Sequence, residues 1–147
     1  DEATYPLHVI LRFEIEKGLV EGTIKPRDVP EEWNARMTEY LGLSTRDNYK
    51  DGPMQDVHWP SGAFGYFPSY TLGAMIAAQL WASLEKDHPS ARDDMRAGRF
   101  VEINNWRRNK IWSQASRYST PELLMKATGE KLNGQYFEDH LKRRYLS

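Results

Sequence analysis

The chain has 147 residues, of which 39% are hydrophobic and 12% aromatic, so its composition is that of a globular domain and excludes a disordered chain. The formal net charge of −1 argues against a nucleic-acid partner bound through phosphate neutralisation, and the absence of cysteine excludes disulfides, thiolate metal ligands and cysteine nucleophiles. A chain without disulfides suits the cytosol, so we expect a cytoplasmic location.

The first part of the chain predicts two helices and then a long loop. We expect a helix over residues 4–17, with Pro6 in its first turn and Gly18 as its C-terminal stop. Its predicted inner face consists of Leu7, Ile10, Leu11 and Ile15. We expect Asp28 to N-cap a second helix that ends at Gly42. Residues 43–68 contain many turn formers, and a loop of this length is usually functional.

The second part of the chain predicts further helices and no strand, so the expected fold class is all-α. The expected helices span residues 69–86, 90–97, 99–117, 120–129 and 134–145. The helix over 69–86 is apolar nearly all round and should be buried on most sides. Prolines and glycines interrupt the uncharged stretch from Val57 to Leu84, so we expect no membrane span. The whole chain, residues 1–147, is expected to be a single helical segment.

Residues 52–73 concentrate the side chains that favour a substrate cleft. Among them His58 is either a loop histidine satisfied by the backbone or by Asp56, or a neutral imidazole that donates to a substrate carbonyl. Tyr66 and Tyr70 are either core tyrosines with satisfied hydroxyls or donors to a developing oxyanion.

Other candidate groups do not form a metal or acid–base site. The four histidines do not occur at the His-Glu-x-x-His spacing that places two zinc ligands on one helix face. Glu14 and Glu16 are two residues apart on a predicted helix and therefore point away from each other. We expect surface or structural roles for both, and no metal site within this chain.

Several blocks of the chain, taken together, resemble a known family. The blocks are Asp-Glu-x-x-Tyr-x-Leu-His from Asp1, Leu-Arg-Phe-Glu-Ile-Glu-Lys-Gly-Leu from Leu11, Gly-x-x-Gln-Asp-x-His-Trp from Gly52, Gly-Tyr-Phe-Pro-Ser-Tyr-x-Leu-Gly from Gly65, and Ala-Thr-Gly-Glu-x-Leu-Asn from Ala127. They resemble the carboxypeptidase Taq family of zinc metallocarboxypeptidases.

The resemblance implies a helical, two-lobed enzyme of the neurolysin type that removes single residues from peptide C-termini and acts as a homodimer. It implies a zinc-bound water as nucleophile, with another divalent metal as an alternative, and a glutamate as general base. The family's His-Glu-x-x-His motif, its third ligand and its arginine motifs all correspond to positions upstream of Asp1. We therefore expect a C-terminal portion of such an enzyme, which needs the N-terminal part and is inactive and free of zinc by itself.

The same resemblance assigns roles to the aromatic stretch. His58 is expected to contact a substrate carbonyl, while Tyr66 and Tyr70 bind the oxyanion or the terminal carboxylate of the peptide, with Tyr70 favoured for the oxyanion. Gln55, Asp56 and Trp59 are expected to bind substrate or to organise the loop, Asp56 by orienting His58. The alternative hypothesis is an independent, non-enzymatic helical interaction module that uses the aromatic stretch as a partner groove or an oligomer interface.

Overall fold

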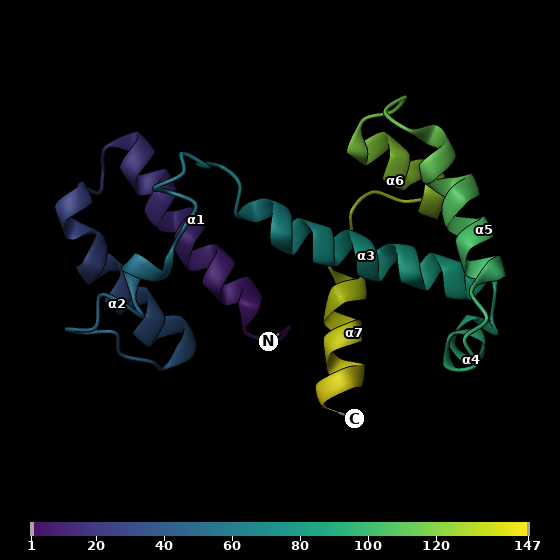
Figure 1. Cartoon of the computed structure of the whole chain (residues 1–147), viewed down its shortest axis with the longest axis horizontal. Coiled ribbons are helices and arrows are strands. Elements are labelled where there is room, and N and C mark those ends of the chain that lie inside the picture. The colour runs from purple at the N-terminus through teal and green to yellow at the C-terminus, as the bar shows by residue number, and fades with distance from the viewer. Residues whose placement is uncertain (1, 147) are drawn as a thin grey trace. The chain divides into compact units, whose positions relative to one another are not determined.

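The computed structural model describes residues 2–146 and is all-helical over that range, which confirms the predicted fold class. Its α-helices are α1 (Tyr5–Glu21), α2 (Val29–Leu41), α3 (Pro68–Asp87), α4 (Ala91–Arg96), α5 (Val101–Lys110), α6 (Thr120–Thr128) and α7 (Gln135–Tyr145) (Figure 1). Short 3-10 helices lie in the connections: η1 (Pro26–Asp28), η2 (Pro53–Gln55) and η3 (Trp112–Gln114).

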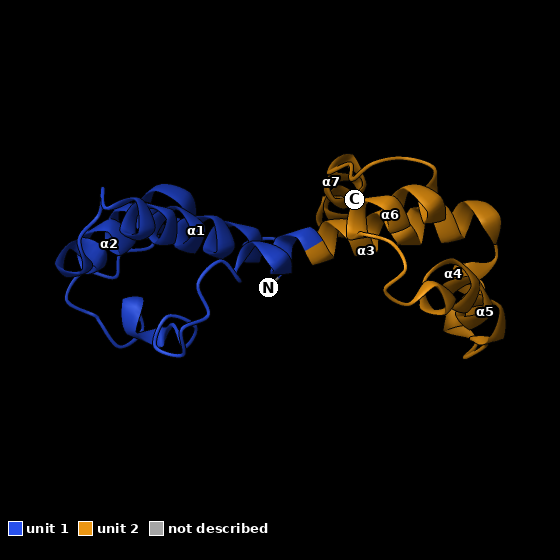
Figure 2. Ribbon diagram, turned by 90° about the horizontal axis from the view of Figure 1, so that it is seen from above, with its two compact units in different colours: residues 1–72 blue, residues 73–147 orange. Residues whose placement is uncertain are grey.

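The chain divides into two compact units, residues 1–72 and residues 73–147 (Figure 2). Unit 1 contains α1, α2 and the first residues of α3, and unit 2 contains the rest of α3 together with α4 to α7. Asp1 and Ser147 lie outside the described residues, so the motif that begins at Asp1 is described only from Glu2 onward.

The core of unit 1 forms where α1 packs against α2. Leu11 and Ile15 are four residues apart on α1, and Trp33 and Met37 are four apart on α2, so each pair lies on one helix face. All four side chains are buried, and Trp59 packs against them from the loop after η2. The predicted inner face is therefore correct for Leu11 and Ile15.

The predicted first helix is wrong at Ile10 and at its C-terminal end. Ile10 is 40% exposed, because the face at positions 11 and 15 is the one that meets α2. Gly18 does not stop α1, which continues to Glu21 and is capped by Gly22 at φ 74°. A Cβ at Gly18 would lie 2.5 Å from Ile24 Cδ1, so the glycine makes room for a side chain that folds back onto the helix.

α2 begins directly after Asp28, as predicted, but Asp28 does not cap the helix through its side chain. Asp28 makes no side-chain hydrogen bond to cap α2. Its backbone is already helical (φ −88°, ψ −10°) because η1 runs directly into α2, and its carboxylate instead accepts a hydrogen bond from the Lys25 amide at 3.2 Å. The helix ends at Gly42 (φ 68°), as predicted.

In unit 2, the helix α3 matches its predicted boundaries but not its predicted burial. Of its residues, Gln79 and Leu84 are buried. Leu84 packs with Ala91 and Ile103, and the Gln79 amide group holds the segment after α6 by donating to Lys131 O (3.0 Å) and accepting from Asn133 N (3.0 Å). The remaining apolar positions of α3 are only partly covered, because the helices of unit 2 pack against part of its surface.

The predicted helix over 99–117 is too long, whereas the last two helices are correct. α5 ends at Lys110, and the chain turns through η3 to Ala115, whose positive φ of 47° is incompatible with a continued helix. Ser119 and Glu122 form the capping box that opens α6, and Gly129 (φ 88°) ends it. α7 begins after Gly134. None of the helices in the described range is long and apolar enough to cross a membrane.

Replacing Gly18 by alanine is expected to lower the free energy of unfolding, because the new methyl group would clash with Ile24. Overpacking of this kind costs about 1–3 kcal/mol, which exceeds the roughly 1 kcal/mol that alanine gains over glycine within a helix. Urea unfolding followed by circular dichroism measures the change.

Gly73→Ala is the matched control, because no atom lies within 4 Å of a Cβ built there in α3. This control should be neutral or should stabilise by about 0.5–1 kcal/mol. In an Ile24→Ala background, Gly18→Ala should become stabilising, since the obstructing side chain is gone. A Gly18→Ala variant more stable than the parent would contradict the packing role of this glycine.

Candidate functional site

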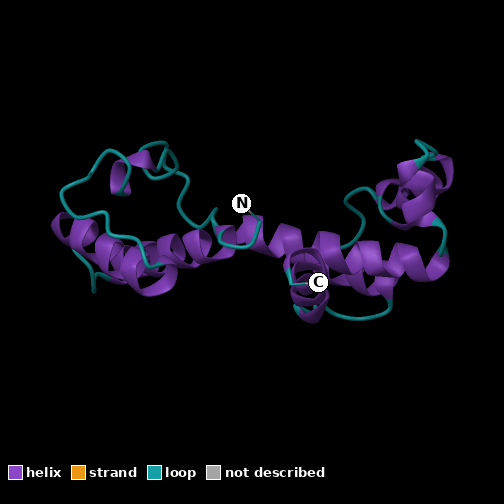
Figure 3. Ribbon diagram, turned by 90° about the horizontal axis from the view of Figure 1, so that it is seen from below, coloured by secondary structure: helices purple, strands orange, loops and turns teal. Residues whose placement is uncertain are grey.

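The six predicted site residues all lie in unit 1, between η2 and the first turn of α3. Gln55 ends η2, Tyr70 lies in the first turn of α3, and the others lie on the loop between them, which Figure 3 shows as part of the long connection after α2. The loop runs close to α1, a helix that begins more than forty residues earlier in the chain.

His58, Tyr66 and Tyr70 form one aromatic cluster. The His58 Nε2 atom lies 3.0 Å from the Tyr70 hydroxyl oxygen. The Tyr66 ring is stacked on the His58 ring, with centroids 5.8 Å apart, and meets the Tyr70 ring edge-on at 5.3 Å. Phe67 is buried beneath them, its ring centroid 4.3 Å from that of His58. The structure thus brings the three predicted catalytic side chains together.

Both tyrosines of the cluster are exposed. Tyr66 is 51% and Tyr70 is 37% exposed, which argues against the alternative of core tyrosines. Desolvation, followed by the neighbouring Tyr66 and Tyr5, raises the pKa of Tyr70 above its ordinary value. Tyr70 therefore keeps its proton at neutral pH and can donate a hydrogen bond.

The His58–Tyr70 contact can work in two directions, depending on the imidazole tautomer. With the proton on Nε2, His58 donates to the Tyr70 oxygen and leaves the tyrosine O–H free for a ligand. With the proton on Nδ1, His58 accepts from Tyr70 and directs its own N–H toward Asp56 Oδ1, which lies 3.6 Å away.

Asp56 organises the backbone that carries His58. Its side chain is almost completely buried, and Oδ1 accepts hydrogen bonds from the backbone amides of His58 (2.7 Å) and Trp59 (3.3 Å). Its Oδ2 accepts a hydrogen bond from Arg12 Nε at 3.1 Å. One carboxylate therefore joins the turn at His58 to the middle of α1.

Arg12 is a site residue that sequence reasoning did not identify. Its guanidinium group donates to His8 O (2.9 Å) as well as to Asp56, and it lies over the rings of Trp33 (4.5 Å) and Phe67 (5.2 Å). Burial lowers the pKa of Arg12, and the charge and hydrogen bond of Asp56 act in the opposite direction. The residue remains charged. The sequence signal that could have identified Arg12 is its position next to Leu11, on the inner face of α1.

Gln55 and Trp59 occupy different surroundings. Gln55 is exposed and donates to Asp51 O at 2.7 Å, which ties down η2. Trp59 is turned toward the helical core, where its ring meets that of Trp33 edge-on at 6.3 Å, and its Nε1 donates to Glu16 Oε2 at 2.9 Å. Glu16 is buried, so the surface role considered for it is wrong.

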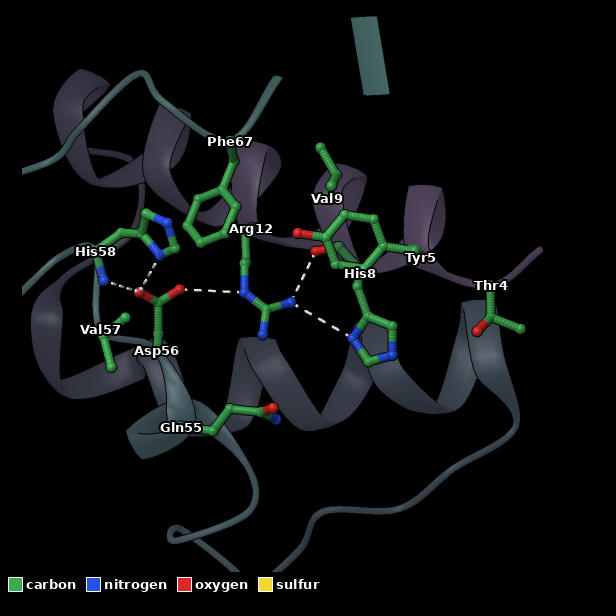
Figure 4. Close-up of a pocket in the computed structure, with 10 residues that line it drawn as sticks. All are labelled: Thr4, Tyr5, His8, Val9, Arg12, Gln55, Asp56, Val57, His58 and Phe67. Carbon is green, nitrogen blue, oxygen red and sulfur yellow. Dashed lines mark hydrogen bonds and ion pairs between the residues drawn. The ribbon is translucent and has the colours of Figure 1, made fainter. Parts of the chain in front are cut away.

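A cavity of about 280 Å³ lies beside His58 (Figure 4). It is lined by Thr4, Tyr5, His8, Val9, Arg12, Gln55, Asp56, Val57, His58 and Phe67. The Tyr5 ring also meets the Tyr70 ring edge-on at 6.0 Å, which connects the cavity to the aromatic cluster. Desolvation and then Arg12 lower the pKa of His8, so this cavity wall carries a neutral imidazole at physiological pH.

The described residues do not fit a metal centre. Within residues 2–146 there is no group of three histidine, cysteine, aspartate or glutamate side chains arranged to hold an ion.

The chain matches known peptidases over nearly its whole length. Residues 1–145 match the family described as carboxypeptidase Taq (M32) metallopeptidase. The chain is 41% identical over 146 residues to thermostable carboxypeptidase 1 of Pyrococcus furiosus and 41% identical over 145 residues to carboxypeptidase 1 of Bacillus subtilis. Each alignment covers 99% of this chain and 29% of the relative.

A solved structure gives the same result. Metallocarboxypeptidase 1 of Trypanosoma cruzi superposes with a TM-score of 0.96 at 48% sequence identity, over 100% of this chain and 31% of that one. The chain thus spans less than a third of the length of the proteins it matches. It belongs to the carboxypeptidase Taq family of metallopeptidases and corresponds to a C-terminal portion of that family.

Proposed function

We propose that this chain supplies the histidine- and tyrosine-bearing side of the substrate site in a metallocarboxypeptidase that removes residues from peptide C-termini. The observation that carries the proposal is the cluster of His58, Tyr66 and Tyr70, joined by the 3.0 Å contact between His58 Nε2 and the Tyr70 hydroxyl. Membership of the peptidase family favours this hypothesis over an independent helical interaction module.

In this proposal Tyr70 stabilises the transition state of peptide hydrolysis. Its raised pKa keeps the phenol protonated at neutral pH, so its O–H can donate to the oxyanion that develops on the scissile carbonyl. A neutral donor adds no charge that the ground state has to solvate. His58 contacts a substrate carbonyl, and Tyr66, the more exposed of the two tyrosines, binds the terminal carboxylate of the peptide.

The surrounding residues support this arrangement. Asp56 holds the backbone at His58 and lies 3.6 Å from its Nδ1 atom, a position that favours one ring orientation. Gln55 anchors η2 at the rim of the cavity, and Trp59 attaches the loop to the core of unit 1.

The metal of the enzyme, which the family resemblance suggests to be zinc, is proposed to be bound outside this chain. The described residues offer no three-ligand group for it, so no step of the reaction is assigned to it. The N-terminal part of the same enzyme is then the partner that completes the site. A cytoplasmic location stays a prediction from the cysteine-free composition.

In the full-length peptidase, Tyr70→Phe is expected to lower kcat by about 10²-fold, the usual effect of removing one oxyanion donor. KM and metal content should change little, because the ring and its packing are retained. Steady-state kinetics on a peptide substrate, together with metal analysis, provides the measurement. Tyr49→Phe, at an exposed tyrosine of the loop after α2, is the control and should keep full activity. An unchanged kcat in Tyr70→Phe would remove Tyr70 from the catalytic residues.

The purified 147-residue chain is expected to show no carboxypeptidase activity and less than stoichiometric zinc. Both expectations follow from a site that contains donors and aromatic rings but no described three-ligand group. Elemental analysis after dialysis and a peptide-cleavage assay measure them. One tightly bound zinc ion per chain would show that the metal site lies in this chain after all.

The same purified chain is expected to form dimers or larger oligomers, in line with the homodimers that the family resemblance implies. Unit 1 exposes apolar side chains around the candidate site, including Met54 (74%), Val57 (70%) and Phe64 (51%), and contiguous apolar surface drives association. Light scattering over a range of concentrations gives the mass. A monomer at high concentration would count against this expectation.

A further inference from the structure

We infer that Glu16 is a positioning residue for the peptidase reaction, whose buried carboxylate holds the loop between His58 and Tyr66 in its active arrangement. This inference rests on the proposed function, because it concerns the geometry of the same aromatic cluster. The hydrogen bonds of Glu16 go to the Trp59 indole and the Gly65 amide, so it acts through the backbone and through Trp59.

The carboxylate of Glu16 bridges two points of the loop. Its Oε2 accepts a hydrogen bond from Trp59 Nε1 at 2.9 Å, and its Oε1 accepts one from the Gly65 amide. Trp59 directly follows His58, and Gly65 directly precedes Tyr66. One side chain on α1 therefore fixes the loop directly beside both candidate catalytic residues.

The loop has local hydrogen bonds at its beginning and at its end, where the amide and the hydroxyl of Ser69 donate to Tyr66 O at 3.1 and 2.6 Å. The amides of Ser61 and Ala63 donate to His58 O at 3.1 and 2.9 Å, which forms a turn after the histidine. Beyond this turn Phe64 is 51% exposed, and Gly65 adopts a positive φ of 77°. Glycine is conformationally free, so the bond to Glu16 restrains the Gly65 backbone in this conformation.

A shift of Gly65 would move the Tyr66 ring relative to its neighbours. The Tyr66 centroid lies 5.8 Å from that of His58 and 5.3 Å from that of Tyr70, so the cluster depends on the backbone that precedes it. Misplacement of a reacting group by about 1 Å can cost 10²-fold in rate. The expected effect of losing the bridge is therefore on turnover.

The charge environment of Glu16 also differs from that of the other carboxylates on or near α1. Asp56 is paired with the Arg12 guanidinium group, and Glu14 accepts hydrogen bonds from Arg36 Nε (3.0 Å) and the Tyr40 hydroxyl (2.7 Å). Glu16 is only 5% exposed, and both of its hydrogen-bond donors in the described structure are neutral N–H groups. Burying a carboxylate in this way is costly unless both oxygens are satisfied.

The test is Glu16→Gln in the full-length peptidase. Glutamine has nearly the same shape, but its amide has a single acceptor oxygen and an NH2 group that would face one of the two donors. We expect kcat to fall about 10-fold to 100-fold while KM and metal content change little. Hydrogen exchange measured by mass spectrometry should show faster exchange in peptides that cover residues 60–67.

Glu14→Gln is the matched control, because Glu14 lies on the same helix and joins α1 to α2. It should lower the free energy of unfolding but leave kcat and the exchange of residues 60–67 unchanged. A purely structural role of Glu16 would give the same result as this control.

A double-mutant cycle with Trp59→Phe isolates the bridge. Phenylalanine lacks the indole donor, so in that background the glutamine introduced by Glu16→Gln can turn its single carbonyl toward Gly65. Glu16→Gln should then cost less in kcat than it does in the parent. Additive effects would contradict the two-point bridge.

The outcomes separate the inference from the proposed function. Faster exchange of residues 60–67 with an unchanged kcat would overturn the positioning role and leave the proposed function intact. A parent protein without carboxypeptidase activity would overturn the proposed function. In that case hydrogen exchange of residues 60–67 alone would test the Glu16 bridge, and unchanged exchange in Glu16→Gln would refute it.

Discussion

The candidate site is attached to α1 by buried carboxylates, and the Arg12–Asp56 ion pair is the first of these attachments. Asp56 accepts hydrogen bonds from the backbone amides that shape the turn at His58. Arg12 supplies the positive charge that offsets the cost of burying the Asp56 carboxylate. The guanidinium group is in turn covered by the rings of Trp33 and Phe67. Removing one partner of such a pair leaves an uncompensated buried charge, which costs about 3–5 kcal/mol, so the loop and the helix core form one unit.

This arrangement explains how a long loop can carry a site that requires defined geometry. Loops are usually mobile, and catalytic groups must be held close to a productive position. Here Asp56 fixes the loop before the aromatic cluster, Glu16 fixes it in the middle, and buried Phe67 fixes it just before α3. The exposed faces of His58 and Tyr66 are then free to meet a ligand, while their backbone is determined by the core of unit 1.

Local signals in the sequence predicted most helix boundaries, because capping depends on residues within one turn. Gly42 and Gly129 end α2 and α6 as expected from the sequence. Two of the failures arise from contacts that local signals do not encode. Gly18 resembles a C-terminal helix stop, but its lack of a side chain serves another purpose, since the Ile24 side chain folds back against α1 there. The burial of α3 was overestimated for the same reason, since apolar character alone does not say which neighbours cover a helix.

The residues of the candidate site could be nominated from the amino-acid sequence alone. The types and spacing of His58, Tyr66 and Tyr70, and their resemblance to a peptidase family, were sufficient to nominate the cluster, and the family membership is confirmed. How the cluster is held became visible only in the folded chain. Arg12 and Glu16 lie 44 and 43 residues before Asp56 and Trp59, and a pairing over that distance depends on how α1 packs against the loop. No periodicity or motif encodes such a contact. It forms only in the folded chain, where the packing of α1 brings Arg12 next to Asp56 and Glu16 next to Trp59.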